Sequence, residues 1–216
     1  MTIIWSSLHR RNLHAIALML LAAAVLCLTL WPKDGFIPED NHLLETVQAV
    51  SLLLACLAHE ARVCRSTQDP LPFLVRHGLA LLMYSFALRE LDIELFGTAP
   101  GWRVAQGFFR FAGAALWVGF LIALMPHLKP MLGQRAAILV TPLGAMTLCG
   151  SLLLAAGWPL DKALFTFVTP LASAFIEEML ELGACLFFLA ASLARDSLRT
   201  EFAGAKTAAV EHGCSA

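Results

Sequence analysis

Residues 170–194, which read PLASAFIEEMLELGACLFFLAASLA, decide the fold class of this chain of 216 residues. The stretch is about as long as a helix that crosses a bilayer, and nearly all of its side chains are apolar or small. The exceptions are Glu177, Glu178 and Glu181, and acids are rare inside membrane helices because their burial is costly. This combination predicts a membrane helix that carries a functional polar site.

The rest of the chain has the same apolar character. Hydrophobic residues make up 59% of the sequence and charged residues only 14%, and the mean hydropathy is +0.73. An ordinary soluble domain is about half apolar and about one quarter charged, so a soluble fold of this size could not bury so much apolar surface. The formal net charge of −1 offers no basic surface for nucleic acid. The sequence therefore predicts an all-α, polytopic membrane protein whose first partner is the lipid bilayer.

Breaks that contain proline or glycine divide the chain into six hydrophobic spans, each long enough for the roughly 20 residues of a crossing helix. The predicted spans are residues 13–31, 42–58, 73–96, 105–125, 136–158 and 160–194. The last is too long for one crossing, so we expect Pro170 to separate a short outer piece, 161–169, from the crossing itself, 170–194. These spans predict a single transmembrane domain over residues 1–196 and a polar, flexible cytoplasmic tail over residues 197–216.

The distribution of Lys and Arg predicts the direction of these six transmembrane helices. If the N-terminus is cytoplasmic, ten of the 15 basic residues fall on the cytoplasmic side, and the other five lie outside or within the spans. The reverse orientation would place the larger group outside, against the positive-inside rule. The first span is followed by no A-x-A cleavage site, so we expect it to remain as an anchor. The prediction is a multi-pass protein of a bacterial-type inner (plasma) membrane with both termini in the cytoplasm.

Ionisable side chains within a span are functional candidates by default, because each costs about 2.5–3.5 kcal/mol on insertion. In the predicted orientation, four spans carry polar groups at a similar depth, about one to three helical turns below the outer surface. The predicted ligand- or ion-binding residues are Glu45, Gln48, Arg89, Glu90, Arg110, Ser173, Glu177, Glu178 and Glu181. We therefore expect side chains from separate helices to meet in one pocket of the outer leaflet.

Acids outnumber bases in this predicted pocket. Its five glutamates meet only two arginines, Arg89 and Arg110, which leaves a formal surplus of three negative charges. At low dielectric such a surplus requires protonated glutamates, a bound cation or an opening to water. Glu177, Glu178 and Glu181 are the candidate metal ligands, since hard cations prefer oxygen donors. The sequence shows no cofactor motif, and its histidines lack the spacing of a haem or zincin site.

Three functions fit this pattern. The leading hypothesis is a site that binds or conducts a proton, a metal ion or a cationic solute. A second is a membrane-embedded hydrolase or transferase for a lipid or polyprenyl head group, in which Arg89, Arg103 and Arg110 hold phosphate and a glutamate acts as base. A third is a non-catalytic subunit that binds a membrane-protein partner or a second copy of the chain through small residues such as Gly113. A competing, purely structural interpretation makes Glu45, Arg89 and Arg110 an ion-pair network that fixes helix register.

The pair Glu177-Glu178 resembles the motif of intramembrane glutamate proteases of the CAAX-processing type. That motif continues to an arginine four residues after the second glutamate and needs histidines in later spans. In this chain Leu182 occupies the arginine position, and only His212 follows. The resemblance ends after two residues, so it carries no activity over to this chain.

Overall fold

The computed structural model describes residues 42–63, 70–91, 100–162 and 169–194. Within these ranges the regular elements are all helical. They are α2 (His42–Val63), α3 (Pro70–Glu90), α4 (Pro100–Leu124), η3 (Met125–His127), α5 (Leu128–Gly133), α6 (Arg135–Val140), α7 (Pro142–Asp161) and α8 (Pro170–Leu193). The all-α prediction is confirmed for this part of the chain.

Four helical segments are long and apolar enough to cross a membrane: Leu44–Val63, Pro70–Glu90, Pro100–Gly133 and Pro142–Leu160. They correspond to the second, third, fourth and fifth predicted spans. Helix α8 has 24 residues, which is also a sufficient length, but it carries three glutamates. The first predicted span, residues 13–31, and the predicted tail, residues 197–216, lie outside the described residues. The described helices are those of a multi-pass membrane protein.

Prolines mark the beginnings of four of the five long helices in the described ranges. The first residues of α3, α4, α7 and α8 are Pro70, Pro100, Pro142 and Pro170. Proline suits this position because the first N–H groups of a helix have no partner within it. At α8 the preceding Thr169 completes the cap, since its Oγ1 accepts the N–H of Ala172 at 3.3 Å. The predicted start of a helix at Pro170 is therefore confirmed.

Several predicted span ends differ from the helices: α2 continues to Val63 rather than 58, α3 ends at Glu90 rather than 96, and α4 begins at Pro100 rather than 105. Two predictions about breaks between helices are also wrong. The predicted fifth span begins at residue 136, but α6 ends at Val140 and α7 begins only at Pro142. Between them Thr141 adopts an extended backbone and caps α7, because its Oγ1 accepts the N–H of Gly144 at 3.0 Å. The predicted break at Pro159 is also absent, since α7 continues to Asp161. Pro159 stands in the last turn, where it removes a single backbone hydrogen bond and leaves little helix to disrupt.

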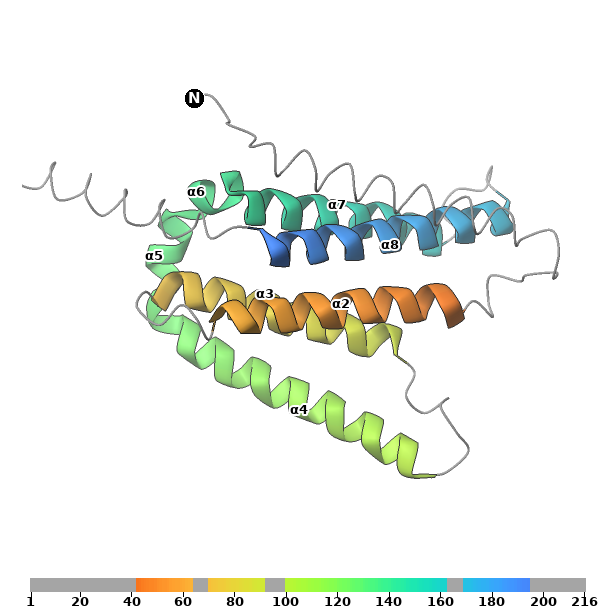
Figure 1. The fold of residues 1–216 in the computed structure, drawn as a ribbon, viewed down its shortest axis with the longest axis horizontal. Helices are drawn as coiled ribbons and strands as arrows, with labels where there is room; N and C mark the ends of the chain where they lie inside the picture. Colours follow the sequence, from red (N-terminus) through yellow and green to blue (C-terminus); the bar gives the residue numbers. More distant parts are fainter. Residues whose placement is uncertain (1–41, 64–69, 92–99, 163–168, 195–216) are drawn as a thin grey trace, which may run out of the picture.

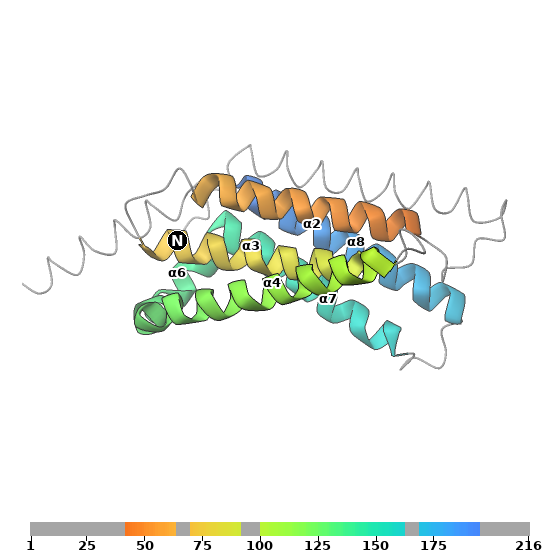
Figure 2. The same cartoon turned by 90° about the horizontal axis from the view of Figure 1, so that it is seen from below.

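Helices α2, α3, α7 and α8 form the core of the molecule, with α7 packed beside α8 and α2 beside α3 (Figure 1). Leu52, Met83, Ala184 and Phe188 are buried together where α2, α3 and α8 meet. Successive helices run in opposite directions, so the beginning of α2, the end of α3 and the beginning of α8 lie at the same end of the bundle (Figures 1 and 2). In the predicted orientation this is the outer end.

Helix α4 lies at the edge of the bundle. It approaches α3 near its C-terminal end and diverges from it toward Pro100 (Figure 1). Near the close end, a Cβ added to Gly78 of α3 would lie 2.7 Å from the ring of Phe120. Only 6% of the apolar window in Pro100–Gly133 is buried, against 39% for the windows in α2 and α3. Most of the α4 surface is therefore apolar and uncovered by the described helices, as expected for a helix that faces lipid.

Candidate functional site

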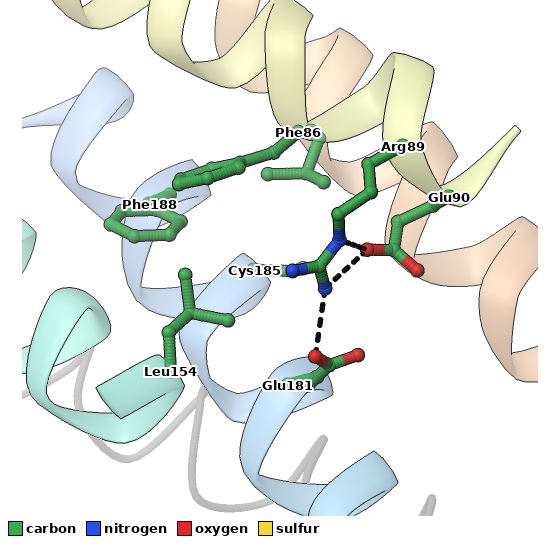
Figure 3. Close-up of a pocket in the computed structure, with 8 residues that line it drawn as sticks. Phe86, Arg89, Glu90, Leu154, Glu181, Cys185 and Phe188 are labelled. Atoms are coloured by element: carbon green, nitrogen blue, oxygen red, sulfur yellow. Dashed lines mark hydrogen bonds and ion pairs between the residues drawn. The ribbon is translucent and has the colours of Figure 1, made fainter. Parts of the chain in front are cut away.

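An ion-pair group joins α3 to α8 (Figure 3). Arg89 Nη2 lies 2.7 Å from an oxygen of Glu181 and 2.7 Å from an oxygen of Glu90, and Arg89 Nε donates to the same Glu90 oxygen at 2.8 Å. The Glu90 and Glu181 side chains are 12% and 18% exposed, whereas the Arg89 side chain is 56% exposed. One guanidinium at the rim thus holds two largely buried carboxylates by charge-assisted hydrogen bonds.

These ion pairs lie against a layer of apolar side chains, which we call the apolar floor. A cavity of about 10 Å³ separates them from the core, and its apolar lining is Leu52, Phe86, Leu154, Cys185 and Phe188 (Figure 3). This volume is about the space that one water molecule needs. Phe86 and Phe188 stack with their ring centroids 6.0 Å apart, which closes the floor toward the bundle centre. The low dielectric of such a floor strengthens every charge interaction above it.

A second polar contact joins α2 to α8. The Gln48 side chain is fully buried, and its Nε2 donates to Glu178 Oε2 at 2.9 Å and to the Glu178 carbonyl oxygen at 3.4 Å. Gln48 Oε1 is also buried, and it has no hydrogen-bond partner within the described ranges. Leaving a buried acceptor unpaired costs about 1–3 kcal/mol. This position therefore favours a proton donor or a cation beside the amide oxygen.

The two contacts belong to one electrostatic cluster. Glu178 experiences the charges of Glu45, Glu90 and Glu181, and Glu90 experiences those of Glu45 and Glu181. Arg89 pairs with two of these four glutamates, Glu90 and Glu181. We call Glu45, Gln48, Arg89, Glu90, Glu178 and Glu181 the glutamate cluster.

Three predicted site residues lie outside the glutamate cluster. Arg110 is exposed on α4 and lines a separate groove. Ser173 donates to the Leu160 carbonyl at 3.1 Å and thereby ties α8 to the end of α7. Glu177 faces α7, where a Cβ added to Gly157 would lie 4.0 Å from its Cγ. Ser173, Glu177 and Glu181 are spaced four residues apart along α8. On a helix of 3.6 residues per turn, each such step rotates the side chain by about 40° around the axis, so the three side chains face different neighbours.

The described geometry offers no metal centre. Within the described ranges, no group of three or more His, Cys, Asp or Glu side chains is placed to hold a metal ion. Glu178 bonds to Gln48 of α2, Glu181 pairs with Arg89 of α3, and Glu177 faces α7. The three predicted metal ligands thus face three different helices, and their role as ligands stays a prediction.

The sequence reasoning missed a polar contact at the opposite end of the bundle. Arg62 donates to the carbonyl oxygens of Leu193, at 2.8 Å, and of Ala194, and Arg76 donates to the Ala194 oxygen at 3.3 Å. The last carbonyls of α8 have no helical partner, and its dipole attracts cations, so the two arginines cap the helix. Arg76 is 2% exposed and also contacts buried His59 at 3.4 Å. The sequence signal for Arg62 and Arg76 was their position near the ends of predicted spans. This position predicted the side of the membrane on which they lie, and it did not predict their contacts with α8.

A scan against protein-family models found no match, and searches of curated proteins and of solved structures found none either. The function of this chain is therefore inferred from the chemistry of its own residues.

Proposed function

We propose that this chain is a multi-pass protein of a bacterial-type inner membrane, with both termini in the cytoplasm, whose glutamate cluster binds and exchanges protons. The apolar helices and the distribution of Lys and Arg support this placement. In it, α8 crosses the bilayer together with the four apolar segments, and residues 13–31 supply a sixth crossing. Glu178 then lies eight residues inside the outer end of α8, about 12 Å along the helix axis.

The observation that carries the proposal is the contact between Gln48 and Glu178. An amide has a donor and an acceptor side, so it can serve a carboxyl group in both protonation states. When Glu178 is ionised, Gln48 Nε2 donates to it, which is the arrangement in the structure. When Glu178 is protonated, its O–H can donate to Gln48 Oε1, the buried atom without a partner in the described part of the chain, after a turn of the amide. The pair is therefore suited to a group that gains and loses a proton.

The charges of the glutamate cluster also favour a proton as the bound cation. The glutamates of the cluster repel one another beside apolar side chains, and each proton that the cluster takes up reduces this repulsion. A proton needs a single oxygen, whereas a metal ion needs several converging ligands, and no such group is found within the described ranges. The Arg89 ion pairs fix Glu90 and Glu181, which leaves Glu178 with a neutral partner and makes it the leading candidate for exchange.

Reconstituted vesicles test this proposal. We expect the purified full chain to carry protons into vesicles that contain a trapped pH indicator when a potassium diffusion potential drives the flux. Glu178→Gln should reduce this flux to the level of empty vesicles, because an amide cannot exchange the proton. Glu60→Gln is the matched control, since Glu60 lies on α2 and pairs with His77 at 2.7 Å outside the cluster.

A second readout separates proton binding from conduction. Infrared difference spectra between acidic and alkaline pH should contain a protonated-carboxyl band that disappears in Glu178→Gln and persists in Glu60→Gln. Wild-type flux in Glu178→Gln would disprove the role of Glu178 in conduction. If the carboxyl band of the wild-type protein also survived in this variant, proton exchange at Glu178 would be rejected altogether.

A further inference from the structure

A groove between α3 and α4 lies beside the glutamate cluster and is not explained by proton exchange. It has a volume of about 340 Å³, and its lining includes Ser85 and Arg89 of α3 and Arg110, Gly113, Ala114 and Trp117 of α4. Two guanidinium groups from two helices therefore reach one open groove.

The two guanidinium groups of this groove differ in their partners. Arg89 is paired with Glu90 and Glu181, but its side chain remains 56% exposed and has further N–H groups to offer to a ligand. Arg110 is exposed and makes no hydrogen bond or ion pair with residues in the described ranges. A guanidinium presents five N–H donors in a planar fork that matches the oxygens of phosphate. The groove therefore has both the charge and the donors to bind an anion.

Arg110 lies on the half of α4 that is nearer to its first residue. It is ten residues, about 15 Å, from Pro100 and fourteen residues, about 21 Å, from Leu124, where α4 ends and the chain continues through η3. Residues 111–126 contain no charged side chain. In the predicted orientation Arg110 therefore lies about one to two turns inside the outer end of its predicted span, from where a long arginine side chain can reach toward the head groups.

The groove below the arginines is shaped for an acyl chain. Trp117 directs its indole N–H to Ser85 Oγ at 2.8 Å, so its aromatic surface remains for apolar contacts. Gly113 and Ala114 lie between Arg110 and Trp117 on the α4 side of the groove, and Leu88 adds an apolar side chain from α3. The polar end at the arginines and the apolar end at Trp117 together match a lipid, whose phosphate and chain have the same order.

We propose that this groove binds an anionic phospholipid of the outer leaflet, with its phosphate held by Arg110 and Arg89 and one acyl chain lying against Trp117. The proposal concerns a lipid site and does not depend on proton exchange at Glu178. Arg110, which lies outside the glutamate cluster, is the residue that distinguishes the two.

Lipid retention by the purified full chain tests the site. Native mass spectrometry should show that the protein released from mixed micelles retains phosphatidylglycerol in preference to phosphatidylcholine with the same acyl chains. Arg110→Gln should weaken this retention about fivefold, the effect of one basic residue near an anionic surface, at about 1 kcal/mol. Arg135→Gln changes the net charge equally, and Arg135 lies on α6 away from the groove, so it should retain the lipid as the wild type does.

Three outcomes would overturn the proposal. Equal losses in Arg110→Gln and Arg135→Gln would show general attraction to anionic lipid rather than a site. Protection of the protein against thermal unfolding by inorganic phosphate alone, to the same degree as by phosphatidylglycerol, would identify free phosphate as the ligand. Ala114→Trp fills the groove without removing a charge, and unchanged lipid retention in this variant would exclude the groove even if Arg110→Gln failed to fold.

Discussion

Arg89 is the residue on which the charge balance of the glutamate cluster depends, since it pairs with both Glu90 and Glu181. In Arg89→Gln the two carboxylates lose their cation and remain in a site that is 12% and 18% exposed. We expect a loss of about 1–2 kcal/mol in unfolding free energy, less than for a fully buried pair because the arginine is half-exposed. Reversible unfolding of the protein in detergent, followed by circular dichroism, measures this loss.

The same residue allows an internal control. Glu181→Gln removes one of the stranded charges, so the double variant Arg89→Gln with Glu181→Gln should recover part of the lost stability. Residues in direct contact typically couple by about 0.5–3 kcal/mol in such a cycle. Strictly additive effects of the two substitutions would mean that the 2.7 Å contact between Arg89 and Glu181 contributes nothing to stability.

The cluster also shows how far sequence reasoning reaches at the scale of single residues. The meeting of side chains from α2, α3 and α8 near one end of the bundle was predictable, because a helix rises about 1.5 Å per residue from a boundary that the sequence marks. The direction of each side chain around its helix was not. Glu177 and Glu178 are neighbours, yet one faces α7 and the other bonds to α2, and this difference depends on how the helices pack.

At the scale of the helix, the end of α8 depends on two arginines that come from other helices. Arg76 is buried and bonds to the Ala194 oxygen and to His59, whereas Arg62 bonds to the same end of α8 from a more exposed position. We expect Arg62→Met to destabilise the protein by about 1 kcal/mol, the contribution of a cation at a helix C-terminus. Arg76→Met should cost more, about 2–3 kcal/mol, because it also leaves buried polar atoms unpaired.

Hydrogen exchange shows which part of α8 is destabilised by Arg62→Met and Arg76→Met. Backbone amides in the last two turns of α8 should exchange faster in both variants, while those near Glu178 should keep their wild-type protection, since helix ends open locally. Arg135→Met is the matched control, because Arg135 is exposed at the start of α6. Uniformly faster exchange along α8 would contradict a local cap.

Helix boundaries were predictable where proline and a capping residue coincide, as at Thr169 and Pro170. The same pair of signals stands at Thr141 and Pro142, where the prediction overlooked it because a run of apolar residues continues on both sides. Pro159 is a signal of another kind, because a proline without a capping residue in the last turn of α7 does not end the helix.

At the scale of the whole molecule, the bundle separates into a packed group, α2, α3, α7 and α8, and a peripheral α4. The composition predicted helices of crossing length, but it could not distinguish a core helix from an edge helix, because lipid and protein interiors are similarly apolar. The buried shares of their apolar windows differ, at 39% for α2 and α3 and 6% for Pro100–Gly133. Peripheral α4 leaves room for the groove that Arg89 and Arg110 line.

Two glycines test this division between core and edge. A Cβ on Gly150 of α7 would lie 2.7 Å from the Phe188 ring and 3.1 Å from the Ala184 carbonyl oxygen, whereas a Cβ on Gly119 of α4 would meet no described atom within 4 Å. Gly150→Leu should therefore separate α7 from α8 and destabilise the protein by about 1–3 kcal/mol or more. Gly119→Leu should change the unfolding free energy by less than about 0.5 kcal/mol, as exposed substitutions do. Thermal unfolding in lipid nanodiscs compares the two, and an equally large loss for Gly119→Leu would mean that protein, not lipid, covers this face of α4.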